Sequence, residues 1–146
     1  MAKNIPLAQR RMARQLVMQA LYQWLLSKQD PLDIKKQFHE DNGKRVDWEY
    51  FDDLFPQIIK QYDALIGHLQ EHLDRDASSL DPVEQSILLL GCYELASRID
   101  VPYRVVINEC VELAKVYGAT DGHKYVNGVL DKLIPTLRAA EFSHQP

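Results

Sequence analysis

Residues 81–99, DPVEQSILLLGCYELASRI, decide most of the fold. Asp81 followed by Pro82 is a strong helix start, because an aspartate accepts hydrogen bonds from the first unpaired amides and proline suits the first helical position. Glu84 stands three residues after Asp81, at the position of the acid in a capping box. The run that follows is long enough and apolar enough to predict a helix at the centre of a core.

The apolar residues of this helix lie on both of its sides. At about 100° per residue, one face consists of Leu88, Cys92, Leu95, Ala96 and Ile99. A helix that is apolar nearly all round is either central in the fold or half covered by a partner, and the sequence leaves both readings open. In the second reading the partner-binding strip consists of Ile87, Leu90 and Tyr93, with Glu84 and Glu94 beside it.

Outward from this helix, a period of 3.6 residues recurs and the alternation typical of strands is absent, which predicts an all-α protein. We expect six or seven helices, near residues 6–27, 30–42, 47–73, 82–99, 103–117 and 121–138. Asp30 and Asp47 stand at the starts of the second and third of these, where aspartate is a preferred helix cap. Pro56 and Pro135 should kink two of them. The polar stretch 75–80 should link two helical halves, about 1–74 and 81–140, of one domain spanning residues 1–146.

Composition agrees with one globular domain: 146 residues, 46% hydrophobic and 26% charged. The longest apolar run is far shorter than the ~18 residues of a membrane span, and no secretory leader is evident. Cys92 and Cys110 fall inside helical patterns, so we expect reduced, buried thiols and a cytoplasmic location. His68 and His72 are spaced for a shared metal, but no third ligand accompanies them, and neither an enzyme nor a cofactor is indicated.

Charge is unevenly distributed. Residues 1–29 contain five basic side chains and no acidic one, whereas the remainder carries 12 basic and 21 acidic ones. On the first helix, Arg10, Arg11, Arg14 and Tyr22 share one flank beside the core face. Guanidinium groups grip phosphates and an aromatic ring stacks on bases, so this flank is either an RNA-binding surface or a plain solvated basic face.

The turn at residues 118–124 offers a second candidate site. Helix amides next to His123 and Lys124 could hold an anion, while Asp121 has a purely structural alternative as a helix cap.

Several motifs resemble one family, the NusB family of bacterial transcription antitermination factors. They are RRMAR at 10–14, QALYQ at 19–23, DVPYRVVINE at 100–109, VELAK at 111–115 and GHKYVNGVLDK at 122–132. The resemblance extends over about residues 6–138 and is closest after Leu80.

The resemblance implies a fold of two helical subdomains and binding to boxA-type RNA together with the ribosomal protein that acts as NusE. It also implies assembly with the elongating RNA polymerase and other Nus factors in support of ribosomal RNA transcription. No cofactor and no catalysis are implied. Some family members form dimers that hide the RNA surface, so a homodimer stays open.

Site residues follow from the matched positions. The implied RNA-binding residues are Lys3, Arg10, Arg11, Arg14, Tyr22, Tyr117, Asp121 and Lys124. Glu84 and the flank of its helix match the side on which the family binds its protein partner.

Overall fold

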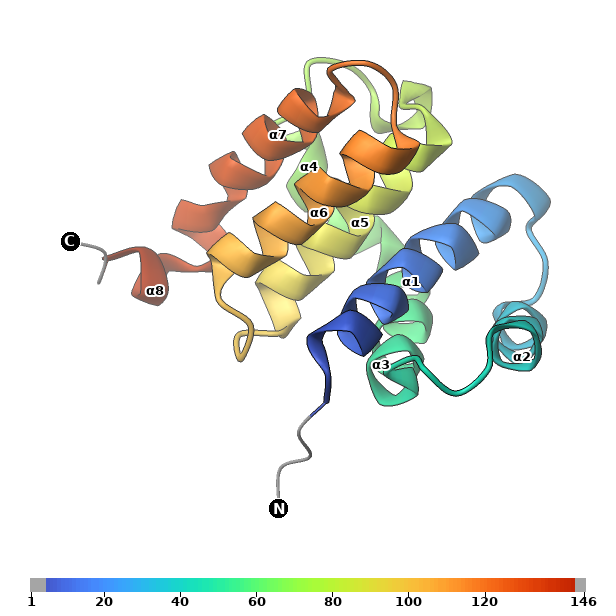
Figure 1. The fold of residues 1–146 in the computed structure, drawn as a ribbon. Helices are drawn as coiled ribbons and strands as arrows, with labels where there is room; N and C mark the ends of the chain where they lie inside the picture. The colour runs from blue at the N-terminus through green and yellow to red at the C-terminus, as the bar shows by residue number, and fades with distance from the viewer. Residues whose placement is uncertain (1–4, 144–146) are drawn as a thin grey trace. The chain divides into compact units, whose positions relative to one another are not determined.

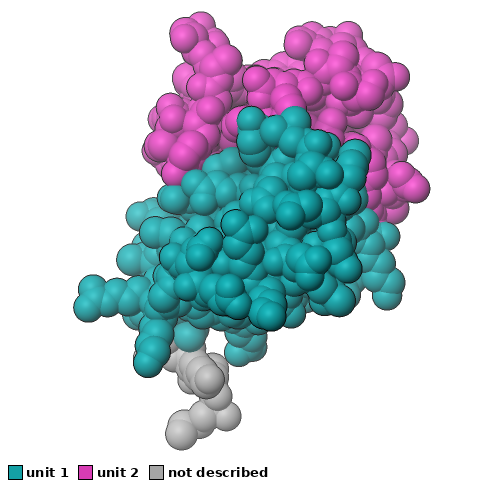
Figure 2. Space-filling view, turned by 90° about the vertical axis from the view of Figure 1, so that its right-hand side faces the viewer, with its two compact units in different colours: residues 1–60 teal, residues 61–146 magenta. Residues whose placement is uncertain are grey.

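A computed structural model describes residues 5–143, and every regular element in that range is helical. The helices are α1 (Leu7–Ser27), α2 (Pro31–Asn42), α3 (Trp48–Lys60), α4 (Tyr62–Gln70), the 3-10 turn η1 (Ala77–Ser79), α5 (Pro82–Ser97), α6 (Tyr103–Tyr117), α7 (Gly122–Leu137) and α8 (Ala139–Ser143). Figure 1 shows these elements, and the all-α prediction is confirmed. The chain divides into two compact units, residues 1–60 and 61–146 (Figure 2).

The first unit is built from α1, α2 and α3, which all contact one another. Asp30 starts α2 as predicted, because its carboxylate accepts a hydrogen bond from the Leu32 amide at 2.9 Å and Pro31 occupies the first turn. The core includes a run of stacked rings in which Phe51 lies 6.0 Å from Phe38 and 5.7 Å from Phe55, centroid to centroid.

The second unit is organised around α5, which contacts α4, α6 and α7. Helices α5, α6 and α7 run alongside one another in Figure 1. Every residue of α5 from Gln85 to Leu95 is buried. Of the two readings that the sequence left open, the structure supports the central helix.

The expected partner strip on this helix is therefore corrected. Ile87, Leu90, Tyr93 and Glu94 are each less than 5% exposed. A side chain without accessible surface cannot present itself to a partner, so these four residues belong to the core. Only Glu84, in the first turn, keeps part of its surface accessible.

The C-terminal segment closes the open ends of two helices. Buried Arg138 donates hydrogen bonds to the carbonyls of Leu95 at 2.7 Å and Glu94 at 3.1 Å, which lie at the end of α5. Glu141 pairs with Arg138 and accepts a hydrogen bond from the Tyr103 amide at 3.1 Å, at the start of α6. One ion pair thus satisfies the Leu95 carbonyl and the Tyr103 amide, two backbone groups that helix ends leave without intrahelical partners.

The division into units differs from the expectation. Pro56 lies inside α3 without ending it, and the helix breaks instead at Gln61. The first unit ends at Lys60, and the stretch 75–80 lies inside the second unit, because α4 packs on α5. Pro135 likewise lies inside α7, which continues to Leu137.

Cys92 and Cys110 are buried thiols that form no disulfide, as expected. Burial raises the pKa of Cys92 to about 12, so its thiol stays protonated and unreactive near neutral pH. None of the helices in the described range has the length and apolar character needed to cross a membrane.

We predict that Gly91→Ala destabilises the protein by about 1–3 kcal/mol, because an added methyl group overpacks a filled core. A Cβ atom at Gly91 would lie 2.8 Å from Leu130 Cδ1 and 3.0 Å from Cys110 Sγ, and both neighbours are fully buried. Gly128→Ala, on an open face of α7, is the matched control and should be neutral or stabilising by up to about 1 kcal/mol. Urea unfolding of both variants measures the difference, and equal midpoints would contradict the close packing.

Candidate nucleic-acid interface

The arginines at the start of α1 differ in their surroundings. Arg11 is exposed, Arg10 is half-buried and Arg14 is only 2% exposed. The sequence placed all three on one accessible flank, and the structure brings only two of them to the surface.

Arg10 is held by α3. Its Nε donates to Asp47 Oδ2 at 3.0 Å, and its guanidinium carbon lies 4.0 Å from the centroid of the Tyr50 ring. Asp47 is buried and caps α3 by accepting a hydrogen bond from the Tyr50 amide at 3.1 Å, as expected from the sequence. The Asp47 amide in turn donates to the Gln9 carbonyl at 3.1 Å. One residue therefore fixes both the start of α3 and the first turn of α1.

Arg14 is corrected from a surface residue to a core residue. Its guanidinium carbon lies 5.4 Å from the Tyr50 ring centroid, within the range of a cation–π contact. Because α1 packs against α3, a residue one turn after Arg10 is covered by the aromatic side of α3. Sequence spacing gave the correct face for Arg14 but could not show how far α3 overlaps that face.

Arg11 and Tyr22 form the accessible part of the predicted flank. Tyr22 is 39% exposed. The two residues are eleven positions apart, which is about three turns, so they lie on one line of the helix roughly 16 Å apart. We call this pair the α1 face. Lys3, the remaining basic residue assigned to this site, lies outside the described residues.

In the second unit, the turn between α6 and α7 carries the other predicted residues. Asp121 sits at the N-terminal boundary of α7 with a left-handed backbone, φ 65°, and its side chain caps no amide. It forms an ion pair with Lys124 instead, Nζ to Oδ1 3.3 Å, and both side chains are well exposed. The capping role proposed for Asp121 is therefore not its role in this structure. Tyr117, at the end of α6, is 37% exposed.

Glu84 lies close to the start of α7. A Cβ atom built on Gly122 would come within 2.9 Å of Glu84 Oε1. Partial burial, reinforced by nearby Asp81, raises the pKa of Glu84, and Arg75 opposes the rise.

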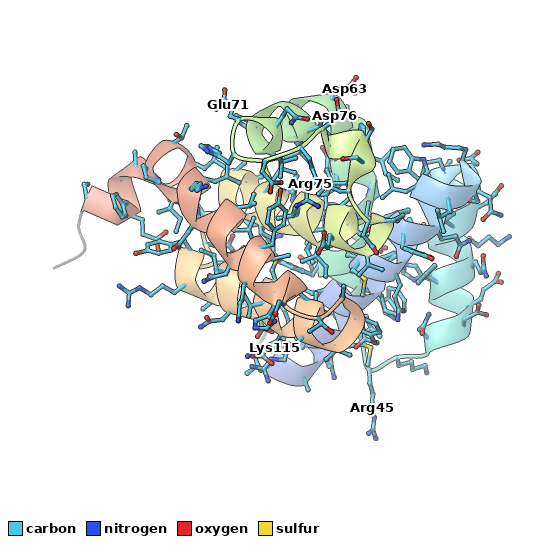
Figure 3. All side chains as sticks on the ribbon, turned by 90° about the horizontal axis from the view of Figure 1, so that it is seen from above. Arg45, Asp63, Glu71, Arg75, Asp76 and Lys115 are labelled. Carbon is cyan, nitrogen blue, oxygen red and sulfur yellow. The ribbon has the colours of Figure 1, made fainter. Side chains whose placement is uncertain are left out.

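A second cluster of polar residues was not found from the sequence. Asp74 accepts hydrogen bonds from Arg75 Nε at 2.7 Å and from the Tyr125 hydroxyl at 2.9 Å, and the Arg75 guanidinium carbon lies 5.0 Å from the Tyr125 ring centroid. These hydrogen bonds lower the pKa of Asp74 to about 2. Figure 3 labels Arg75 in this region. The contact joins residues 51 positions apart, so no local pattern could have revealed it.

Between residues 5 and 143, no group of three or more His, Cys, Asp or Glu side chains is placed to hold a metal ion. The accessible chemistry of the described sites consists of cations, aromatic rings and single carboxylates.

The sequence model of the NusB family matches residues 11–135. The transcription antitermination protein NusB of Nitrosomonas europaea is 47% identical over 138 residues, which cover 94% of this chain and 83% of the relative. The solved structure of T. maritima NusB superposes with a TM-score of 0.81 at 26% identity, covering 92% of this chain and 96% of that one. A crystal structure of the antitermination factors NusB and NusE with double-stranded RNA matches with a TM-score of 0.79 at 28% identity, covering 88% and 97%.

We predict that Arg14→Ala lowers the free energy of unfolding by about 1–3 kcal/mol, because the variant removes a buried side chain from the contact with α3. Arg11→Ala, at an exposed position, is the matched control and should change stability by less than about 0.5 kcal/mol. Chemical denaturation of the two variants tests the assignment. If the two variants are equally stable, the assignment of Arg14 to the core is wrong.

Proposed function

This chain belongs to the NusB family, and we propose that it is a transcription antitermination factor that binds RNA together with a NusE partner. The RNA is of the boxA type, and the complex acts on the elongating RNA polymerase in support of ribosomal RNA transcription in the cytoplasm. The role in antitermination follows from relatives of nearly equal length.

The observation that carries the RNA assignment is the α1 face. Arg11 presents a permanently charged, bidentate phosphate donor, and Tyr22 presents an aromatic surface about 16 Å along the same line of the helix. A single strand bound there can place a phosphate on the guanidinium and a base on the ring. Arg10 supports this arrangement from its fixed position between Asp47 and Tyr50.

In the second unit, Tyr117 and Lys124 make the proposed RNA contacts, and Asp121 lies at the same site and modulates them. Lys124 supplies a cation at the start of α7, where helix amides also favour an anion. Asp121 works against this contact, because its carboxylate pairs with the lysine and repels phosphate.

For the protein partner, Glu84 is the accessible residue of the five first assigned. Its carboxylate suits a partner with a basic surface. The competing reading, a helical scaffold that contacts proteins without RNA, uses Glu84 but leaves the α1 face without a role.

We predict that Arg11→Ala weakens RNA binding about tenfold at low salt, because one phosphate contact and its counterion release are lost. The log–log salt slope should become shallower by roughly 0.7, the contribution of one phosphate on a single strand. Fluorescence titration of a boxA-type RNA at several salt concentrations, with and without NusE, measures both quantities.

Lys132→Ala, which removes one exposed charge from α7, serves as the charge-matched control and should bind as the unaltered chain does. Glu84→Lys should lose the gain brought by NusE, because a like charge then meets a basic partner. If Arg11→Ala keeps the affinity and the salt slope of the unaltered chain, the α1 face is not an RNA site, and the result favours the scaffold that contacts proteins without RNA.

We predict that Asp121→Asn binds RNA more tightly at low salt. The change breaks the ion pair with Lys124, releases the lysine to phosphate and removes a repulsive charge. Asparagine tolerates the left-handed backbone at this position, so the thermal midpoint should move little. Lys124→Ala should weaken binding. Titrations at low and high salt should show the Asp121→Asn gain shrinking as salt rises, and an unchanged low-salt affinity would remove this turn from the RNA site.

A further inference from the structure

The segment between α2 and α3 is a short basic loop that the functional assignment above does not use. It comprises residues 43–47, Gly-Lys-Arg-Val-Asp. We call it the 43–47 loop. Lys44 and Arg45 are both exposed, and Figure 3 shows Arg45 reaching out from the ribbon.

Contacts at both ends hold this loop in place. At its start, Trp48 Nε1 donates to the Gly43 carbonyl at 2.8 Å, and Gly43 adopts a φ of 69°, which glycine reaches without steric cost. At its end, the Asp47 amide donates to the Gln9 carbonyl at 3.1 Å, and Val46 is buried. The loop is therefore a fixed platform for two cationic side chains.

The same contacts place the loop beside the first turn of α1. Asp47 bonds both Gln9 and Arg10, and consecutive Cα atoms are 3.8 Å apart, so the Arg45 Cα lies within roughly 8 Å of the Asp47 Cα. An arginine or lysine side chain spans a further several ångströms. Arg45 and Lys44 are therefore two and three residues along the chain from Asp47, which contacts Arg10 within the same unit.

Neither cation is neutralised locally. In the described part of the chain, no carboxylate forms an ion pair with Lys44 or Arg45. Asp47, the acid nearest in sequence, is buried and already paired with Arg10. Asp41 and Glu49 flank the loop and reduce the long-range field there.

We propose that Lys44 and Arg45 bind backbone phosphates of the RNA and extend the site at the start of α1 onto the 43–47 loop. The proposal rests on the RNA-binding function proposed above. Both side chains are donors without an acceptor inside the described fold, and both are mounted on a backbone that is tied to Gln9 and Arg10. Because the contacts are to phosphates, they add affinity without sequence preference.

The test is titration of a boxA-type single-stranded RNA with the full chain and with the double variant Lys44→Ala/Arg45→Ala. We expect binding about tenfold weaker at 50 mM salt and a log–log salt slope shallower by roughly 1.4, which corresponds to two phosphates. The conservative variant Arg45→Lys should retain most of the affinity, because lysine also binds a phosphate as a point charge. Thermal unfolding of the double variant should match that of the unaltered chain.

The matched control is Lys36→Ala/Lys60→Ala, which removes the same charge from exposed positions on α2 and α3. It should bind with the affinity and slope of the unaltered chain. If the unaltered chain binds RNA and the loop variant binds equally well, or if the control weakens binding as much, the loop contact is overturned and the proposed function stands. If the unaltered chain binds no RNA with or without NusE, both proposals fail.

Discussion

The buried carboxylate of Asp47 is the interaction on which the geometry of the candidate site depends. It caps α3 through the Tyr50 amide and holds Arg10 through an ion pair, while its own amide bonds the Gln9 carbonyl. A buried carboxylate is stable only when hydrogen bonds and a partner charge replace its water. Here that requirement fixes the first turn of α1 against α3 and sets the direction of the neighbouring arginines.

Within the second unit the corresponding constraint is the burial of α5. A helix with no polar face has to be enclosed, and α4, α6 and α7 contact it. The Leu95 carbonyl near its C-terminus is satisfied by Arg138, which reaches it from beyond α7 and is itself balanced by Glu141. The charges of Arg138 and Glu141 therefore stabilise the fold, and only side chains that remain accessible can bind a ligand.

The same division applies to the arginines of α1. A helix that carries three guanidinium groups within one and a half turns can use them for packing or for binding. In the structure Arg14 is packed in the core and Arg11 is exposed, while the exposure of Arg10 is intermediate. The ring of Tyr50 contacts the guanidinium groups of both Arg10 and Arg14. The exposed guanidinium groups at the start of α1 are therefore fewer than the sequence suggests.

The sequence by itself determined the helical class, the caps at Asp30, Asp47 and Asp81, the buried thiols and the family, because these depend on local periodicity, on side chains next to helix ends and on motif identity. It also placed Arg11 and Tyr22 on one face, since helical spacing alone sets that angle. Only the tertiary structure decided that Arg14, Ile87, Leu90, Tyr93 and Glu94 are covered. Only the structure, too, paired Asp74 with Tyr125, tied the 43–47 loop to α1 and ended the first unit at Lys60. Helical periodicity gives the direction of a side chain, whereas its burial depends on which other helix packs over it, and that is a property of contacts between residues distant in the sequence.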